Sequence, residues 1–411
     1  MTLMTGKIKV QNWILLIFSL FFYAWGEPIW VVLMVGTGTF AWLMGFVIEN
    51  SPSAAKRRSA LIAATVVMLG SLGIFKYTNF FVEQLNVIPF MNIPHPEIRL
   101  PIGISFYTFQ VLTYVIDLYR GEVKLQRKLH KFLLYQASFP QLIAGPIVRY
   151  SDIAYQIDNR TISLEGVKSG AGRFLIGLAK KVIMANGTGQ LVALTMKTDN
   201  LSSLTGIAAW AGLIGYAFQI YFDFSGYSDM AIGMGRMFGF HFKENFNYPY
   251  IAGSVTEFWR RWHISLSTFF RDYVYIPLGG NRRHQMRNMF IVWGLTGFWH
   301  GASWNFILWG LYFFVLLAVE KTVLLKVLSK VPQIFGLIYT TFAYLMGWVL
   351  FYYTDLGRAR QFTRQLFRPA AWADPASGTL VLSYLFLLIV CAIASTPIVP
   401  WIRGLIAKED A

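Results

Sequence analysis

Apolar residues recur along the whole chain in runs long enough to cross a lipid bilayer, with short polar stretches between them. A helix needs about 20 residues for one crossing, so the pattern predicts roughly ten membrane segments. These segments are residues 13–25, 29–47, 61–81, 102–118, 132–148, 167–185, 204–222, 230–240 with its flanks, 290–317, 335–351 and 380–399. We therefore predict an all-α integral membrane protein.

Several of these segments contain residues that interrupt an ordinary membrane helix. Pro140 and Pro146 fall in "SFPQLIAGPIVRY", and Pro277, Gly279 and Gly280 fall in "YIPLGG". Irregular backbone is tolerated at membrane depth where it is buried in protein or lines a wet cavity. We expect broken or re-entrant elements around a central tunnel rather than a simple bundle.

Composition supports a membrane protein. The 411 residues are 55% hydrophobic and 14% charged, whereas soluble domains carry about 25% charged residues. The net charge is +16, but the basic residues fall between apolar runs, where they anchor cytoplasmic loops and can also face an anionic substrate. We expect these basic residues to contact the lipid bilayer, and we expect no nucleic acid partner.

The single cysteine, Cys391, excludes an internal disulfide, a cysteine-based zinc site and a thioredoxin-type pair. We expect no bound metal. No internal repeat divides the chain, so we expect one polytopic membrane domain over residues 1–411. Lys7 and Lys9 precede the first apolar run, which favours a cytoplasmic N-terminus and a retained first helix.

The six histidines differ in their surroundings. His95, His130 and His284 lie in polar, loop-like stretches, and His241 ends an apolar run. His263 lies in "FWRRWHISLSTFFRDYVYIPLGG", where arginines and aromatic residues alternate too closely for one helix face to hide the charges. That segment is predicted to line a cavity or lie at the membrane interface.

His300 lies in "GFWHGASWNF", a stretch with no charged residue within ten positions on either side. Burial among Phe298, Trp299, Trp304 and Phe306 would disfavour its cation, so the imidazole should be neutral. A neutral, desolvated histidine can act as a general base. The alternative is a structural hydrogen bond between helices, and the residues alone leave both interpretations open.

Carboxylates and cations inside or beside apolar segments form the remaining candidates. Asp223 and Asp229 in "YFDFSGYSDM" either touch a tunnel or have a structural role, as a helix cap or paired with Arg236, Arg260 or Arg261. Arg149, Lys180 and Lys181 either contact the phosphates of a coenzyme A-type donor or anchor the protein at the interface.

Six strings in order resemble the membrane-bound O-acyltransferase (MBOAT) family, and within it the alginate O-acetylation (AlgI-like) subgroup. They are "LPIGISFYTFQ" (100–110), "FPQLIAGPIVRY" (139–150), "GLAKKV" (177–182), "YFDFSGYSDMAIG" (221–233), "FWRRWHISLSTFFRDYVYIPLGGNR" (258–282) and "GFWHGASWNFILWG" (297–310). The motif-bearing core spans about residues 72–310. One departure is that the family usually carries another apolar segment before the "FFYAW" helix, so the chain is expected to be short at its N-terminus.

The resemblance implies a multi-helix membrane protein with a central tunnel. The histidine of the family's "WHG" motif, its catalytic residue, maps onto His300, and the histidine of "RWH", its second site residue, maps onto His263. The implied activity is O-acetylation of an extracytoplasmic polysaccharide, such as alginate or peptidoglycan, at a bacterial cytoplasmic membrane. The implied donor is cytosolic acetyl-CoA or another acyl thioester, with no tightly bound cofactor, and a separate extracytoplasmic acetyltransferase is the expected partner.

The chemistry of acyl transfer assigns roles to these residues. It needs a base, donors for the developing oxyanion, and exclusion of water. We expect His300 as the base, and His263, Asn305 or a backbone N–H as the donor. Trp299 and Trp304 would exclude water, and Arg260 and Arg261 are further tunnel candidates. The alternatives are D-alanyl transfer to teichoic acid, a non-enzymatic transporter and an export scaffold.

Overall fold

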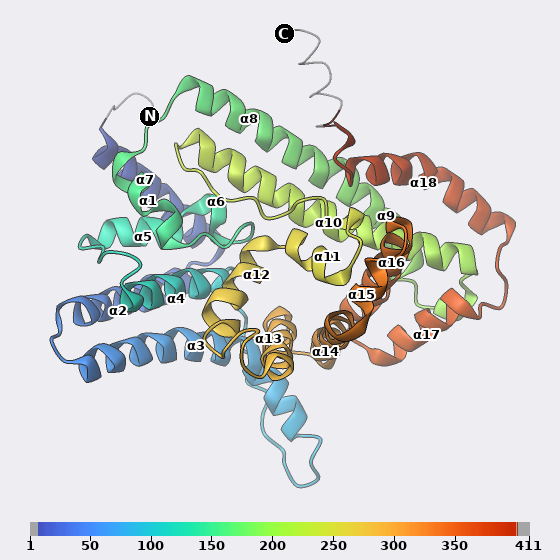
Figure 1. Cartoon of the computed structure of the whole chain (residues 1–411), viewed down its shortest axis with the longest axis horizontal. Helices are drawn as coiled ribbons and strands as arrows, with labels where there is room; N and C mark the ends of the chain where they lie inside the picture. Colours follow the sequence, from blue (N-terminus) through green and yellow to red (C-terminus); the bar gives the residue numbers. More distant parts are fainter. Residues whose placement is uncertain (1–6, 400, 402–411) are drawn as a thin grey trace. The chain divides into compact units, whose positions relative to one another are not determined.

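The structure is a computed structural model that describes residues 7–399 and 401. Across these residues the chain is helical with no strand, as the hydrophobic pattern predicts (Figure 1). The described residues form two compact units. Unit 1 runs to Leu175 and includes Ser228–Lys243, whereas unit 2 holds Ile176–Tyr227 and the residues from Glu244 onwards.

Unit 1 is built on three neighbouring helices, α2, α3 and α4, which pack against one another (Figure 1). Its helices are α1 (Ile8–Gly26), α2 (Trp30–Asn50), α3 (Ala54–Leu85), α4 (Ile104–Arg120), α5 (Leu129–Ala137), α6 (Phe139–Leu142), α7 (Tyr150–Asn159) and most of α8 (Leu164–Ala179). Ser53 caps α3 by accepting a hydrogen bond from the backbone of Lys56. Gly103 and Gly121, at φ 78° and 77°, bound α4 because glycine adopts the left-handed region without steric cost.

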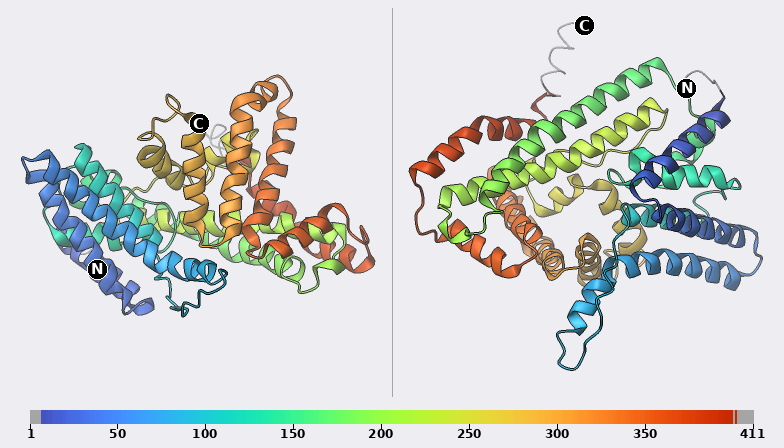
Figure 2. Two further views of the ribbon diagram at one scale, coloured as in Figure 1. Left: turned by 90° about the horizontal axis from the view of Figure 1, so that it is seen from below. Right: turned by 180° about the vertical axis from the view of Figure 1, so that it is seen from behind.

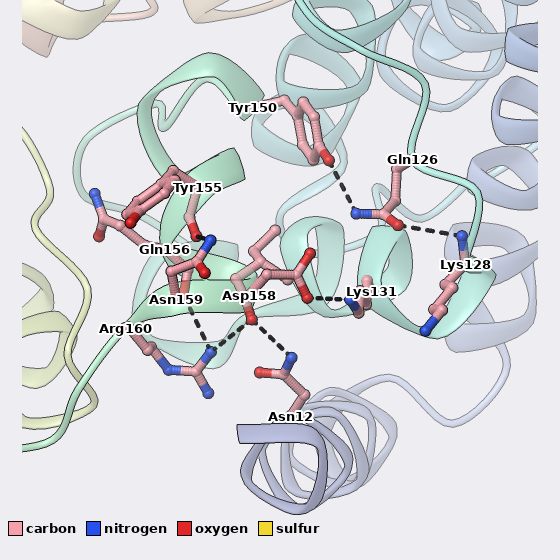
Figure 3. Close-up of polar contacts among 11 residues, drawn as sticks. Asn12, Gln126, Lys128, Lys131, Tyr150, Tyr155, Gln156, Asp158, Asn159 and Arg160 are labelled. Carbon is pink, nitrogen blue, oxygen red and sulfur yellow. Dashed lines mark hydrogen bonds and ion pairs between the residues drawn. The ribbon is translucent and has the colours of Figure 1, made fainter. Parts of the chain in front are cut away.

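A polar cluster ties α1, α5 and α7 together in unit 1 (Figure 3). The ammonium group of Lys131 pairs with the carboxylate of Asp158. The Asn12 amide donates to the carbonyl of Ile157 at 2.9 Å, and the Gln126 amide donates to the Tyr150 hydroxyl at 3.0 Å. These contacts hold the three helices through polar groups rather than apolar packing alone.

Unit 2 contains the remaining helices, several of which carry a short π-helical or 3₁₀ turn. They are η1 (Lys180–Ala185), α9 (Asn186–Thr195), η2 (Leu201–Ser203), η3 (Pro249–Ile251), α11 (Val255–Arg261), α12 (Ile264–Phe270), η4 (Arg271–Tyr275), α13 (Gln285–His300), α14 (Trp304–Val319), η5 (Glu320–Leu324), α15 (Leu325–Leu328), α16 (Gln333–Tyr352), α17 (Leu356–Phe367) and α18 (Pro375–Ala394). Helix α10 (Gly206–Met237) contributes its first part to unit 2 and its last part to unit 1.

Among the residues that the structure describes, six helices are long and apolar enough to cross a membrane: α1, α2, α3, α10, α16 and α18. The chain is therefore a multi-pass membrane protein. Two predicted boundaries were wrong. Segments 204–222 and 230–240 are one continuous helix, α10, because the Gly, Ser and Asp residues between them do not stop a helix. Segment 290–317 is two helices, α13 and α14, which residues 301–303 separate.

The predicted interruptions are confirmed. Helix α5 ends at Ala137, α6 is a single turn that contains Pro140, and residues 143–149 are not helical. The "YIPLGG" stretch leaves the π-helical turn η4 and bends through Gly279 and Gly280, which have φ values of 110° and 54°. Proline removes a backbone donor and glycine tolerates positive φ, so both breaks follow from residue type.

Glycines set the close approach of α13 and α14, which lie side by side with α16 in unit 2 (Figure 2). A Cβ atom on Gly297 would lie 2.3 Å from the carbonyl oxygen of Phe306, and one on Gly310 would lie 2.4 Å from that of Trp293. Small residues allow such approaches between membrane helices. The chain therefore turns back tightly just after His300.

Candidate active site

Helix α11, which leads to His263, begins on two side chains that accept its free N–H groups. The Ser254 hydroxyl accepts from the backbone of Glu257 at 3.0 Å. The buried carboxylate of Glu320 accepts from the backbone N–H groups of Val255 and Thr256 at 2.6 and 2.7 Å. A carboxylate at a helix N-terminus is favoured by the helix dipole and satisfies unpaired donors. Glu320 therefore fixes the start of the helix that presents His263.

His263 forms the junction between α11 and α12 and adopts a left-handed backbone conformation, with φ 43° and ψ 56°. A non-glycine residue in this region costs about 1–2 kcal/mol, so the surrounding structure must hold it there. The backbone N–H of Ile264 donates to the carbonyl of Asn245 at 2.9 Å and ties down the junction. Strained residues of this kind cluster at functional sites.

The imidazole of His263 is 3% exposed and is held at one of its two nitrogens. Nδ1 lies 3.1 Å from the side-chain oxygen of Asn245. Nε2 is buried and has no hydrogen-bond partner within the part of the chain that the structure describes. His263 lies outside the six long apolar helices. Burial first, and then His300, lower the pKa of His263 well below its ordinary value, so the ring is neutral.

His300 is the last residue of α13, directly before the turn into α14. Its ring contacts aromatic rings on three helices. The ring centroids lie 4.9 Å from Trp299, 4.9 Å from Trp309 and 5.2 Å from Phe351. A fourth ring, Phe306, lies 6.5 Å away. Trp299 and Phe306, two of the four aromatic residues expected around His300, therefore contact its ring, and Trp309 and Phe351 join them.

His263 and His300 line one cavity of about 620 Å³ within unit 2. Trp299 contacts both rings, with centroid separations of 6.2 Å to His263 and 4.9 Å to His300. The wall also includes Trp259, Trp293 and Met289 as apolar surface. The structure thus brings together the two histidines that the sequence separates by 37 positions.

The charged residues that line this cavity are cations: Arg260, Arg271 and Lys321. No aspartate or glutamate from the described part of the chain lines it. Arg271 pairs with its neighbour Asp272 at 2.6 Å. Burial first, and then the positive charge of Arg260, lower the pKa of Lys321 below its ordinary value. The neighbouring carboxylate of Glu320 acts in the opposite direction. The side chains of Arg260, Arg271 and Lys321 give this part of the cavity wall a basic character.

The predicted carboxylates lie elsewhere. Asp223 pairs with Lys181, and Asp229 pairs with Arg173 through nitrogen–oxygen distances of 2.6 and 2.9 Å. Their suggested partners, Arg236, Arg260 and Arg261, were therefore wrong, because adjacent turns of α8, η1 and α10 bring other cations closer. Arg261 instead forms an ion pair with Glu257 at 2.7 Å.

The other candidates are also not among the residues that line the cavity. Asn305 is fully buried and donates to the carbonyl of Leu350 at 3.1 Å, which ties α14 to the end of α16. Trp304 starts α14 with 51% of its surface exposed. Arg149 immediately precedes α7, and Lys180 begins η1.

Sequence reasoning missed Asn245, Glu320 and Lys321. Glu320 carried a signal, because it is the first charged residue after an uncharged run that begins at Asn288. Lys321 follows it directly. Asn245 carried no comparable signal, since "KENFNYP" looks like an ordinary polar loop.

Comparison with known proteins gives a consistent result. The family model for MBOAT, the membrane-bound O-acyltransferase family, matches residues 126–354. The "Probable alginate O-acetylase AlgI" of Pseudomonas aeruginosa is 42% identical, over 92% of this chain and 76% of that protein. The "Peptidoglycan O-acetyltransferase" of Helicobacter pylori is 36% identical, over 82% and 70%. The "Teichoic acid D-alanyltransferase" of Bacillus subtilis is 30% identical, over 56% and 62%.

Proposed function

The chain belongs to the membrane-bound O-acyltransferase family, and we propose that it moves acetyl groups from a cytosolic thioester towards a polysaccharide outside the cell. The observation that carries this proposal is the single cavity that both His263 and His300 line. A cavity with two imidazoles and an aromatic wall provides proton transfer and limits the access of water.

We assign the removal of the hydroxyl proton to His300. The hydroxyl oxygen of the acceptor bonds to the acetyl carbonyl carbon, and the carbon–sulfur bond breaks. The proton passes to the imidazole and then to the departing thiolate, which leaves as a thiol. General base catalysis of this kind contributes about 10²- to 10⁴-fold in rate. The collar of Trp299, Trp309 and Phe351 packs against the ring and limits the access of water to it.

We assign the phosphates of the donor to the cationic wall of the cavity. Arg260, Arg271 and Lys321 lie on α11, η4 and η5 and line the same space as the histidines. Acetyl-CoA and an acyl carrier protein both carry the thioester on a phosphopantetheine arm, so either donor presents an anion here. Lys181 is a weaker candidate, because Asp223 already neutralises it. Arg149 and Lys180 are not among the residues that line the cavity.

The acceptor and the partner are proposed from the relatives. Proteins that are 42% and 36% identical are named for alginate and peptidoglycan acetylation and align with most of this chain. A polysaccharide acceptor at a bacterial cytoplasmic membrane fits both, with a separate extracytoplasmic transferase that completes delivery. D-alanyl transfer ranks lower, because the teichoic acid relative aligns with 56% of this chain at 30% identity.

The test is the acetyl content of surface polysaccharides, measured by mass spectrometry in a deletion strain. The strain is complemented with wild type, His300→Ala, His263→Ala or the control His95→Ala, whose histidine is exposed on an irregular segment. Membrane levels of each variant are equalised first. We expect wild type and His95→Ala to restore acetylation and His300→Ala to reduce it by at least about 10²-fold.

Two results would overturn the proposal. Full restoration by His300→Ala would remove the catalytic assignment. A wild-type gene that restores D-alanyl groups but no acetyl groups would replace acetylation with D-alanylation, and the same mass spectra distinguish the two by the mass of the added group.

A further inference from the structure

Three hydrogen-bonding groups converge on the side-chain oxygen of Asn245, which is 1% exposed. They are the backbone N–H of Ser265 at 3.2 Å, the hydroxyl of Ser265 at 2.9 Å and Nδ1 of His263 at 3.1 Å. The backbone carbonyl of Asn245 also accepts from Ile264 at 2.9 Å. One residue therefore holds both the backbone and the ring of the His263 junction.

This arrangement determines which nitrogen of His263 carries the proton. A backbone N–H can only donate, so the Asn245 atom that faces Ser265 is the carbonyl oxygen and not the amide nitrogen. An amide oxygen can only accept, so Nδ1 of His263 must donate to it. The Ser265 hydroxyl lies farther from Nδ1, at 3.4 Å, than from the Asn245 oxygen. If Nδ1 lacked a proton, it would face the Asn245 oxygen as a second acceptor, which is unfavourable.

The opposite nitrogen then has a lone pair. Nε2 is buried, and within the described residues no group donates to it. The residue lines the cavity that also contains His300. A buried acceptor without a partner is unfavourable, and such atoms in native structures call for an explanation, such as a catalytic role or an absent ligand. The left-handed backbone of His263 is a second, independent sign that the position of this ring is imposed.

We propose that Asn245 is a positioning residue that holds His263 in the Nδ1–H tautomer, so that Nε2 accepts a hydrogen bond from a hydroxyl group of the acyl acceptor. The inference rests on the proposed function for the identity of that ligand, a hydroxyl-bearing molecule. Under this proposal His263 does not donate to the oxyanion, because Nε2 of the Nδ1–H tautomer carries no proton. A sugar acceptor offers neighbouring hydroxyls, so His263 can orient one while His300 takes the proton of the reacting one.

Asn245→Asp is the most informative variant. The aspartate side chain has the same shape as asparagine and still accepts hydrogen bonds from the backbone N–H and the hydroxyl of Ser265. It places a negative charge beside Nδ1–H, which favours the imidazolium and raises the pKa of His263. The other titratable and charged groups that line the cavity with this ring are His300, Tyr275, Arg260, Arg271 and Lys321, and the variant leaves them unchanged. Protonation removes the lone pair at Nε2, so activity should fall on the acid side of the pH profile.

The direct measurement is nitrogen-15 NMR of ring-labelled histidine in the full chain reconstituted in lipid. The His263 signals are assigned by their absence in His263→Gln. We expect Nδ1 to carry the proton and Nε2 to show the shift of a bare nitrogen in wild type and in Ser265→Ala, which keeps the backbone donor. In Asn245→Leu we expect a mixture of tautomers, and in Asn245→Asp a ring that gains its second proton at a higher pH than in wild type.

The activity measurement uses radiolabelled acetyl-CoA and inverted membrane vesicles. The acid limb of the pH profile should move up by about 1–3 pH units in Asn245→Asp, and should not move in the control Asn159→Asp, at the exposed end of α7. A purely structural role for Asn245 would lower activity at every pH without moving the limb.

A proton on Nε2 in wild type, or an unmoved acid limb in a folded Asn245→Asp, would overturn the inference. Neither result bears on the proposed function, which fails separately if His300→Ala retains acetylation. The NMR result also stands without any turnover, so the two failures are distinguishable.

Discussion

Two polar clusters in this protein have different roles. In unit 1, the cluster on α7 places Lys131 against Asp158 and Arg160 against the carbonyls of Ile157 and Phe238 (Figure 3). The Arg160 guanidinium also stacks on Phe240 at 4.4 Å. In unit 2, the cluster around His263 is uncharged and borders a cavity.

The difference shows how the partners of polar groups distinguish a structural cluster from a reactive one. The charged side chains of the α7 cluster meet an opposite charge or a carbonyl, and none of them lines the cavity. Around His263 the donors and acceptors are arranged so that one nitrogen is held and the other has no partner among the described residues. A structural cluster should therefore affect stability when it is altered, whereas a reactive one should affect turnover.

The largest expected effect concerns the two histidines together. His300→Ala should lower acetyl transfer by about 10²-fold or more because it removes the base. His263→Ala should lower it by about 10²-fold because it removes a contact that orients the acceptor. When groups act as a unit, the effects of removing them do not add. The double variant His263→Ala/His300→Ala should therefore be about as active as the less active of the two single variants. Transfer rates in vesicles that contain equal amounts of each protein test this. Losses that multiply would mean that the histidines act independently, in spite of their shared cavity.

Glu320 connects stability to the site. Replacement with alanine leaves the N–H groups of Val255 and Thr256 without their acceptor in a buried place, which costs about 1–3 kcal/mol. The midpoint temperature of thermal unfolding in detergent should fall together with activity in Glu320→Ala. Glu320→Gln should recover part of both quantities. The control Asp355→Ala removes an exposed cap of α17 and should leave turnover unchanged. Full activity in a destabilised Glu320→Ala would show that α11 does not need this cap to present His263.

The cations of the cavity should affect donor binding rather than chemistry. Arg260→Gln or Lys321→Gln removes one charged contact to a phosphate and should raise the KM for acetyl-CoA about tenfold, with little change in kcat. Arg282→Gln, an exposed basic residue that is not among those lining the cavity, is the matched control. If the control raises KM equally, the effect comes from the general positive charge and not from the cavity.

The smallest effect should come from the α7 cluster. Lys131→Gln removes the partner of Asp158, whose side chain is 45% exposed, so the loss of stability should be about 1 kcal/mol. Turnover per folded molecule should not change, and Lys128→Gln, which alters an exposed neighbour, should change neither quantity. A specific loss of turnover in Lys131→Gln would contradict the division between the two clusters.

Much of the fold followed from residue pattern alone. The apolar runs predict the membrane helices because a bilayer requires long hydrophobic segments with internally satisfied backbones. Pro140 and the glycines at 279 and 280 predict the breaks. The pattern failed between residues 290 and 317, because Gly301 to Ser303 carry no proline or charge, and the reversal there depends on packing at Gly297 and Gly310.

The site divides in the same way. The residue pattern is enough to identify a membrane protein with two unusual histidines, since an imidazole between Trp299 and Gly301 has no role in solubility. It did not determine that His263 and His300 share a cavity, that Asn245 holds the ring of His263, or that Lys181 and Arg173 neutralise the carboxylates of α10. Those facts depend on contacts between residues far apart in the chain, and local pattern carries no information about which distant groups meet.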